Sequence, residues 1–376
     1  VICENIDDFR KIPIISKEDI IENMDLFINK SLISDKINAN TGGSSGTPMS
    51  FYLHKGYTRP KEKAHFDWYW RKFGFVMDSR GLMARGASLK NNINFEYQSI
   101  SNKLNVSCYS INQNNIKQVV NEINKFKPVY IHAYPSALKI LVQEILDSEL
   151  ELSIKIELIF LGSEYLFEDD RVLFENFFKA KVVNWYGHSE CLIHGGNCQI
   201  KNEYHFYPFY GYIELLDENN NLITQVGQQG RIIATGFDNK VMPLIRYDTG
   251  DIGTLGDCSL CKCGFEGITL SKIDGRDRDF IILSDKTKVS TTAFIFGQHF
   301  NEFSKIKELQ LQQDEIGKII LRLRLGVGYT EKDEVAIMQK MLKSVNNKLK
   351  IEFDYVEHIP KTHRGKHRFL IQNIEA

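Results

Sequence analysis

The chain alternates helical and strand patterns between residues 114 and 187, and this alternation constrains its fold more than any other feature. Apolar side chains at Ile116, Val119, Val120 and Ile123 fall on one face of a helix that Pro128 ends. Further helices are predicted from Pro135, with Leu138, Leu141, Val142 and Ile145 facing inward, and over 169–180; strands are predicted at 129–131, 156–162 and 181–187. Strand–helix–strand order of this kind predicts an α/β fold with a mostly parallel sheet.

The pattern changes after Phe206. Residues 211–236 predict strands joined by polar turns, which is a β-rich section of the same large domain. From about Gly275 the pattern predicts a strand at 280–283, a helix at 291–300, strands at 308–312 and 318–325, a helix at 332–349 and a last strand at 351–359. We therefore predict a large N-terminal domain over 1–274 and a small α+β domain over 275–376.

Composition narrows the class of protein. The 376 residues carry a formal net charge of −1, which argues against a nucleic-acid partner. Hydrophobic residues make up 43% and charged residues 25%, as in globular proteins, and no apolar run reaches the ~18–20 residues of a membrane span. We expect a cytoplasmic protein without a signal peptide; its first residue is Val1, so N-terminal residues before it are expected to be missing from this sequence.

One segment, NTGGSSGTP at 40–48, holds three glycines and four hydroxyl side chains and nothing apolar to bury. A flexible linker has this composition. A phosphate-binding loop has it too, because glycines let backbone N–H groups turn toward one point and hydroxyls add donors. It is not a Walker A loop, since Thr47 and Pro48 follow Gly46 in place of Lys-Ser/Thr.

Four further polar segments have the composition of a ligand site. They are WYGHSE at 185–190, PLIRYDTGDIG at 243–253, DGRDRDF at 274–280 and HRGKHRF at 363–369. The first follows a predicted strand, and ligands of open α/β sheets bind at the carboxyl ends of strands. Taken singly, each is also explained as an ordinary loop: a strand exit, a turn capped by Asp251, a solvated linker and an exposed basic turn.

Seven cysteines are present, and their spacing does not indicate a disulfide framework. The count is odd, and Cys258, Cys261 and Cys263 lie within six residues. This pattern favours a metal site, with free thiols elsewhere. The alternative is that these three cysteines bind nothing.

Together and in this order, the segments resemble the adenylate-forming superfamily of acyl- and aryl-CoA ligases. The resemblance is strongest to the phenylacetate–CoA ligase-like branch and its capsule-polysaccharide-biosynthesis members, and it runs from about residue 40 to the end. AYPSAL at 133–138 and GSEYL at 162–166 add to it. It implies that ATP and a carboxylic acid form an acyl-adenylate and pyrophosphate, after which the acyl group passes to a thiol, usually that of coenzyme A.

The resemblance also assigns roles to individual residues. The nucleotide-binding set that it implies is Ser44, Ser45, Gly46 and Thr47 for the phosphates, Gly162, Ser163 and Glu164 for the adenine pocket, Tyr186 stacked on adenine, Gly187 and Ser189 beside the phosphates, and Asp251 with Arg276 on the ribose. Glu190 would hold Mg²⁺. His188, His194 and Cys191 are interpreted as pocket wall or ordinary packing. Where relatives often carry a lysine in the phosphate loop, this chain has Met49.

Lys366 resembles the lysine that family members bring to the active site on a mobile C-terminal domain. There it would bridge the carboxylate and the α-phosphate, where negative charge accumulates. The pivot would be Arg278, where relatives more often have Asp or Lys.

Relatives also carry a Cys…His pair followed by a C-x-C-G segment. That likeness implies a structural Zn²⁺ site made by Cys198, His205, Cys261 and Cys263, with Cys258 left over. A site with four protein ligands has no open position, so no catalytic role is expected for the zinc.

We therefore predict an ATP-dependent carboxylate-activating ligase, with a small-molecule acid as substrate and coenzyme A as acceptor. Two alternatives stay open: transfer to a sugar amine or carrier protein in surface-polysaccharide assembly, and a nucleotide-binding protein that has lost its chemistry. The resemblance to capsule-polysaccharide-biosynthesis members suggests the amine acceptor. The chain also has no glycine between Phe280 and Gly297, where many coenzyme A-using members have a glycine-containing turn, although Lys286 and Lys288 there could attract the phosphates of coenzyme A. The acid itself and the oligomeric state are not predicted.

Overall fold

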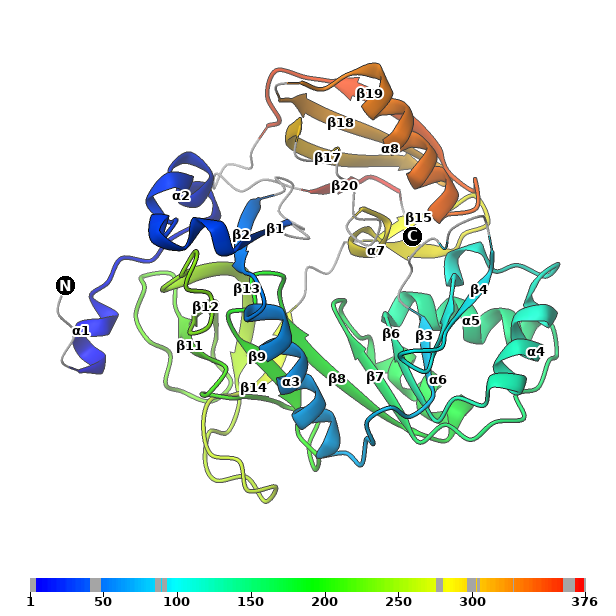
Figure 1. Cartoon of the computed structure of the whole chain (residues 1–376), viewed down its shortest axis with the longest axis horizontal. Coiled ribbons are helices and arrows are strands. Elements are labelled where there is room, and N and C mark those ends of the chain that lie inside the picture. The colour runs from blue at the N-terminus through cyan, green and yellow to red at the C-terminus, as the bar shows by residue number, and fades with distance from the viewer. Residues whose placement is uncertain are drawn as a thin grey trace. The chain divides into compact units, whose positions relative to one another are not determined.

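The structure is a computed structural model of the chain, shown in Figure 1. It describes residues 5–40, 49–84, 89, 93–274, 280–295, 302, 305–326, 328–360 and 369–374. Contacts divide the chain into a first unit, made of Val1–Thr41, Met49–Gly74 and Trp185–Gly275, and a second unit, made of Gly42–Pro48, Phe75–Asn184 and Arg276–Ala376.

The second unit contains the predicted strand–helix alternation. Its strands β3 (Gly81–Ala84), β4 (Phe95–Gln98), β5 (Lys103–Val106), β6 (Tyr130–Ala133) and β7 (Leu158–Gly162) lie in the order β7-β6-β3-β5-β4. All of these neighbours are parallel except β4 and β5. The helices are α4 (Ile116–Phe126), α5 (Pro135–Asp147) and α6 (Glu168–Phe178). The predicted α/β class with parallel strands is confirmed.

The helical faces predicted from the sequence are buried. Ile116, Val119, Val120 and Ile123 of α4 and the inward residues of α5 belong to one hydrophobic core cluster with strands β5, β6 and β7. Pro135 occupies the first turn of α5, where its missing N–H costs nothing. The 3.6-residue periodicity therefore identified the faces correctly.

The last hundred residues of the second unit carry a sheet of their own. Strands β17 (Ile306–Glu315), β18 (Lys318–Leu325), β19 (Lys350–Tyr355) and β20 (Leu370–Gln372) lie in the order β19-β18-β17-β20. Helix α8 (Glu331–Ser344) contacts β19 (Figure 1). A separate hairpin, β15 (Phe280–Ile282) with β16 (Lys288–Ser290), precedes the short helix α7 (Thr291–Ile295).

Two predictions in this region need correction. The helix predicted over 332–349 ends at Ser344, because Asn346 and Asn347 adopt positive φ angles that end the helical backbone. The strand at 351–359 is not the last one. β20 follows it and pairs in parallel with β17, and its three residues are too few for a periodicity to reveal.

The first unit is built mainly from antiparallel strands. They are β8 (Lys181–Gly187, only its last residues in this unit), β9 (His194–Asn197), β10 (Tyr204–Phe206), β11 (Gly211–Leu216), β12 (Gln229–Gly236), β13 (Tyr247–Leu255) and β14 (Thr269–Asp274), in the order β11-β12-β13-β14-β10-β9-β8. The predicted β-rich section is confirmed, and its core cluster includes Ile213, Leu215, Ile232 and Leu270. Helix α3 (Thr58–Arg71) buries Tyr69 and Trp70.

The N-terminal part of the first unit holds the ends of the glycine-rich segment. It also contains helices α1 (Ile6–Arg10) and α2 (Lys17–Glu22) and strands β1 (Lys36–Asn40) and β2 (Ser50–His54). β1 and β2 are antiparallel, with Asn40 opposite Ser50. Asn40 at the start of the segment and Ser50 just after it are thus strand neighbours, while residues 41–48 lie outside the described part of the chain.

The predicted boundary between residues 274 and 275 and the mobility of the small domain stay predictions. Among the described residues, no helix is both long and apolar enough to cross a bilayer.

Candidate functional site

Two pairs of tyrosine and carboxylate side chains meet where β8 and β13 carry the predicted motifs. The hydroxyl of Tyr186 donates to Oδ2 of Asp251 at 2.7 Å. The hydroxyl of Tyr247 donates to Oε1 of Glu190 at 3.2 Å. Each segment thus supplies one donor and, four residues later, one acceptor, and the two segments bind each other reciprocally.

This meeting requires a strongly curled sheet. Three strands, β14, β10 and β9, lie between β13 and β8 in the strand order. A flat sheet would place β8 and β13 about 19 Å apart at ~4.8 Å per strand, which is farther than a tyrosine and an aspartate can bridge. The curl of the antiparallel strands therefore brings the two motifs together.

The electrostatics of the pairs keep both tyrosines neutral. Burial raises the pKa of Tyr186 well above its ordinary value, and the Asp251 carboxylate raises it further. Burial and the neighbouring Glu190 do the same to the pKa of Tyr247. Both hydroxyls therefore remain donors at neutral pH, and each carboxylate oxygen that they contact keeps lone pairs for other partners.

The predicted turn around Asp251 is wrong. Residues 249–251 lie inside strand β13, where the register with β12 shifts between Arg231 and Ile233 and forms a bulge. Gly250 has a φ angle of +75°, which glycine adopts without strain. A bulge changes the direction in which a side chain points relative to a regular strand. Here the Asp251 carboxylate contacts the hydroxyl of Tyr186.

Sequence reasoning also missed the anchor of this strand. Arg246 precedes Tyr247 and forms a two-bond ion pair with Glu214, Nε to Oε2 at 2.9 Å and Nη2 to Oε1 at 3.1 Å. The two side chains are 6% and 1% exposed. A buried, two-bond pair of this kind fixes the direction of β13. An arginine next to the aromatic-acidic motif was visible in the sequence, but its partner, 32 residues earlier, was not.

The predicted adenine-pocket residues Gly162, Ser163 and Glu164 follow β7 in the second unit. Ser163 has a φ angle of +68° and is exposed, and the Glu164 carboxylate accepts hydrogen bonds from the backbone N–H and the hydroxyl of Ser136, both at 3.0 Å. Glu164 therefore caps the N-terminus of α5, a stabilising position for an anion. This contact links two of the predicted motifs, AYPSAL and GSEYL.

The other predicted site residues divide into two groups. Gly187 ends β8, and Ser189 stands in the turn after it, beside Glu190, whose side chain is 6% exposed. Six predicted residues lie outside the described part of the chain: Ser44, Ser45, Gly46, Thr47, Arg276 and Lys366. Their roles stay predictions.

The four predicted metal ligands come together in the first unit. One ligand atom each from Cys198, His205, Cys261 and Cys263 lies within 4.8 Å of the others. The sulfur atoms of Cys198 and Cys261 are 3.7 Å apart, as are the Cys263 sulfur and Nδ1 of His205. Three thiols and one imidazole at these separations match the donor set of a tetrahedral Zn²⁺ site.

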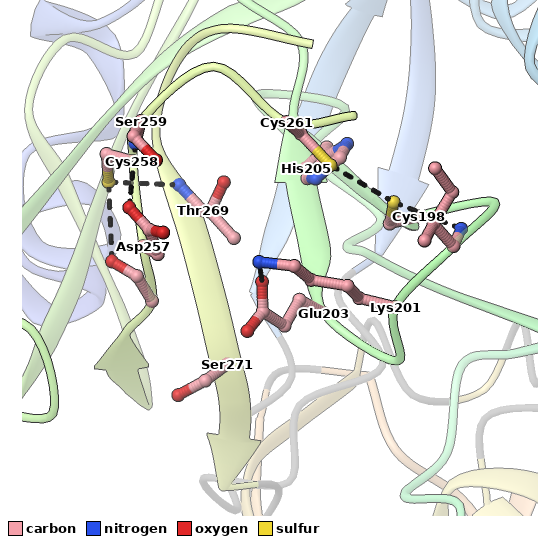
Figure 2. Close-up of polar contacts among 12 residues, drawn as sticks. Cys198, Lys201, Glu203, His205, Asp257, Cys258, Ser259, Cys261, Thr269 and Ser271 are labelled. Atoms are coloured by element: carbon pink, nitrogen blue, oxygen red, sulfur yellow. Dashed lines mark hydrogen bonds and ion pairs between the residues drawn. The ribbon is translucent and has the colours of Figure 1, made fainter. Parts of the chain in front are cut away.

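Cys258 is not part of this group. Figure 2 shows its sulfur beside Thr269, whose backbone N–H it accepts at 3.5 Å, away from Cys198 and Cys261. It serves as a matched control for the other cysteines.

The surroundings of the cluster suit a metal. The ring of Phe265 stacks on His205 with 4.1 Å between centroids, which orients the imidazole. Burial lowers the pKa of His205 to about 4, so this ring is neutral and can coordinate at physiological pH. Burial raises the pKa of Cys263 to about 11, so its thiolate forms only when a cation stabilises it.

A further polar cluster lies next to Glu190 and had not been predicted. The thiol of Cys191, 5% exposed, donates to Oε1 of Glu62 at 3.3 Å and accepts from Arg59 at 3.5 Å; Arg59 also pairs with Glu62 at 2.7 Å. Burial raises the pKa of the thiol well above its ordinary value. These contacts tie α3 to the segment that carries Glu190.

Comparison with known proteins finds similarity along the chain. Residues 281–373 match the family model "CapK C-terminal domain". The chain is 27% identical to protein CapK of Staphylococcus aureus over 377 residues, covering 98% of this chain and 81% of CapK. It is 29% identical to phenylacetate–coenzyme A ligase of Thermus thermophilus over 167 residues, covering 43% of this chain and 37% of that enzyme.

Solved structures share the fold. A structure of 2-hydroxyisobutyryl-CoA ligase with 2-HIB-AMP and CoA in the thioesterification state aligns with a TM-score of 0.58 and 16% identity, covering 98% of this chain and 82% of that one. An open conformation of the same ligase gives 0.54, with 83% of its chain covered. The chain is thus similar to protein CapK along nearly its whole length and to phenylacetate–coenzyme A ligase over part of it, and it has the fold of 2-hydroxyisobutyryl-CoA ligase.

Proposed function

We propose that this protein activates a carboxylic acid with ATP and transfers the acyl group to coenzyme A. In the first step a carboxylate oxygen attacks the α-phosphorus of ATP, and pyrophosphate leaves. In the second step the thiol sulfur attacks the acyl carbon, and AMP leaves. The observation that carries the proposal is the reciprocal pair, Tyr186 with Asp251 and Tyr247 with Glu190, in a chain related to ligases of this kind.

In this proposal the two carboxylates divide the nucleotide between them. Asp251 accepts hydrogen bonds from the ribose hydroxyls, with Tyr186 holding its other face, and the ring of Tyr186 packs on the base. Glu190 is a buried carboxylate with one tyrosine donor, and its free lone pairs fit Mg²⁺, which prefers oxygen ligands. The ion would neutralise charge on the triphosphate.

Residues outside the described part complete the proposed site. Ser44, Ser45, Gly46 and Thr47 would donate to the β- and γ-phosphates between two paired strands. Arg276 would assist at the ribose. Lys366 would stabilise the charge that develops between the carboxylate and the α-phosphate.

The β15–β16 hairpin bears on the identity of the acceptor. Lys286 adopts a φ angle of +66° at the turn where a glycine is absent, and Asp285 pairs with Lys348 at 2.7 Å. Lys286 and Lys288 remain exposed and available to phosphates of coenzyme A. Gly317 packs against Ser284 so closely that a Cβ there would come within 2.9 Å of its backbone. The hairpin is therefore tightly held, and we keep an amine or a carrier protein as the second candidate acceptor.

As part of the same proposal, we place this reaction in surface-polysaccharide assembly, on the resemblance of the chain to capsule-polysaccharide-biosynthesis members and its similarity to protein CapK. We further propose that Cys198, His205, Cys261 and Cys263 hold a structural Zn²⁺. The geometry of the four donors supports this ion, and their mutual closeness gives it no substrate position.

Acid-dependent exchange of labelled pyrophosphate into ATP tests the first step across a panel of acids. Exchange with one class of acid, slowed at least ~10²-fold by Lys366→Ala, is the expected result. Exchange with no acid, or unaltered exchange in that variant, would contradict the proposal. The acyl-adenylate is then given coenzyme A: thioester and rapid AMP release support the ligase, and a persistent adenylate supports the amine or carrier acceptor.

A further inference from the structure

His188 is a polar side chain that the proposed reaction leaves without a role. It follows β8 directly, two residues after Tyr186 and two before Glu190. Its backbone carbonyl accepts from the N–H of Cys191 at 3.1 Å, which closes a turn. Both ring nitrogens, Nδ1 and Nε2, are buried and have no hydrogen-bond partner in the part of the chain that the structure describes. The interpretation as ordinary packing does not account for them.

Folded proteins rarely leave buried nitrogens unpaired, because the group loses its hydrogen bonds to water and gains none. The Tyr186 and Tyr247 hydroxyls donate to Asp251 and Glu190, and neither forms a hydrogen bond with the ring. The rings of Tyr186 and His188 lie 6.1 Å apart at 32°, a packing contact without a hydrogen bond. Among the described residues none pairs with the ring, which is the arrangement expected for a side chain that binds a ligand.

The chemistry of the ring narrows that ligand. A neutral imidazole has one N–H donor and one acceptor nitrogen, so it needs a partner of each kind. His188 lies in sequence between the residues proposed to contact the nucleoside and the residue proposed to hold Mg²⁺, where the acyl–phosphate bond would form. Phosphate and acyl oxygens only accept hydrogen bonds, so they satisfy the N–H of the ring. The acceptor nitrogen requires an O–H or N–H group, which the acid can supply.

We propose that His188 binds a hydroxyl or amino substituent of the carboxylic acid, and that the enzyme activates substituted acids in preference to plain hydrocarbon acids. This inference rests on the proposed function and makes His188 a specificity residue. The imidazole exposes no nitrogen to water in the free protein, so it selects against an acid that leaves both nitrogens unpaired.

The first experiment uses stability and needs no knowledge of the acid. His188→Leu replaces two unpaired polar atoms with an apolar side chain of similar size, so the Tm of the ligand-free chain should stay the same or rise. His358→Leu, at an exposed position, is the control for the effect of replacing a histidine with leucine. A Tm lower by several degrees in His188→Leu alone would show that the ring has a partner within the protein, and would overturn the proposal.

The second experiment measures pyrophosphate exchange with matched acids, such as a hydroxybenzoate and benzoate, or a hydroxyalkanoate and the alkanoate. The wild-type chain should prefer the substituted acid at least ~10-fold, His188→Leu should lose that preference with an unchanged KM for ATP, and His188→Gln should keep part of it. Equal losses for both acids, or a raised KM for ATP, would assign the ring to the acyl oxygen, a buried water or the nucleotide and overturn the inference. Absence of exchange with every acid in the wild type would instead end the proposed function.

Discussion

The cysteine cluster and the tyrosine–carboxylate pairs occupy the same unit, but they use polar side chains in opposite ways. Cys198, His205, Cys261 and Cys263 turn their ligand atoms toward one another, within 4.8 Å. Glu190 and Asp251 instead each accept a hydrogen bond from a neutral tyrosine. The first arrangement closes around one ion, and the second holds anionic groups ready for a ligand.

We therefore expect the cysteine cluster to contribute to the stability of the fold and the tyrosine–carboxylate pairs to contribute to catalysis. Side chains that bind one ion together link metal binding to folding, so substitution of one of them should lower the stability of the folded chain. Carboxylates held by hydrogen bonds from tyrosines can act on a transition state without reorganising. Variants in the two regions should therefore affect different measurements.

The largest effect is expected from Glu190→Gln, which removes the charge but keeps the size of the side chain. Adenylation should slow by about 10²-fold or more, the scale seen when one preorganised charge-stabilising group is lost. Zinc content should be unchanged. Pyrophosphate exchange measures the rate, and elemental analysis measures the metal.

Glu203→Gln is the matched control in the other region, since Glu203 pairs with Lys201 beside the cysteine cluster (Figure 2). It should leave adenylation near the wild-type rate. Equal rates in both variants would remove Glu190 from the catalytic site and erase the distinction between the regions.

The second prediction concerns the cluster. Cys261→Ser should abolish tight Zn²⁺ binding and lower Tm by at least about 3 °C, because the metal stabilises only the folded chain. Cys258→Ser should retain about one zinc per chain, since that sulfur contacts Thr269 and not the other ligands. Zinc in both variants, or in neither the variants nor the wild type, would contradict the proposed site.

Sequence alone predicted the two regions unequally. The cysteine cluster was identifiable because two of its members, Cys261 and Cys263, lie in a cysteine-rich segment, and the family pattern supplied Cys198 and His205. The residues Glu190 and Asp251 were also named, but not the tyrosine bonds that orient them. Those bonds depend on the curl of a sheet in which three strands separate β8 from β13. Periodicity predicts elements and their buried faces, and it contains no information on such curvature.

The same reason explains the other misses. Arg246 finds Glu214 across two strands, and Cys191 finds Glu62 on α3; neither pair has a local sequence signal. The bulge that holds Asp251 was interpreted as a turn, because the sequence Thr-Gly-Asp is compatible with a turn and with a bulge. Only the hydrogen-bonded pairing with β12 before and after the bulge distinguishes the two. Helices α4 and α5 were predicted well because their apolar faces repeat over several turns.

The third prediction tests whether the tyrosines position the carboxylates. Tyr247→Phe removes the hydrogen bond to Glu190 and leaves its charge, so the loss should be smaller than in Glu190→Gln. A hydrogen bond to a charged group contributes about 1.5–3 kcal/mol. If about half of this free energy acts in the transition state, kcat falls about 4- to 13-fold. The dependence on Mg²⁺ should shift to higher concentration, because Glu190 is less well oriented. A normal kcat with a normal Mg²⁺ dependence would reduce Tyr247 to a packing residue.

The smallest effect is expected in the stability of the chain at alkaline pH, where the two regions again differ. Burial raises the pKa of Tyr247 above its ordinary value near 10, and Glu190 adds to this. The unfolded chain therefore loses this proton first as pH rises above 10, and it then binds fewer protons than the folded chain. The free energy of unfolding should consequently decrease with pH, by about 1.4 kcal/mol per pH unit for each such tyrosine, and be unaffected by it below pH 10. Tyr247→Phe should reduce this slope by about 1.4 kcal/mol per pH unit. The free energy of unfolding is measured by urea unfolding between pH 9 and 11, roughly the range around the ordinary tyrosine pKa. Excess zinc is present so that the cysteine cluster stays saturated. The control is Tyr57→Phe, at an exposed position, which should leave the slope as in the wild type. A slope that is equal in all three chains would mean that Tyr247 ionises in the folded state as it does in the unfolded state, and the hydrogen bond to Glu190 would then be absent in solution.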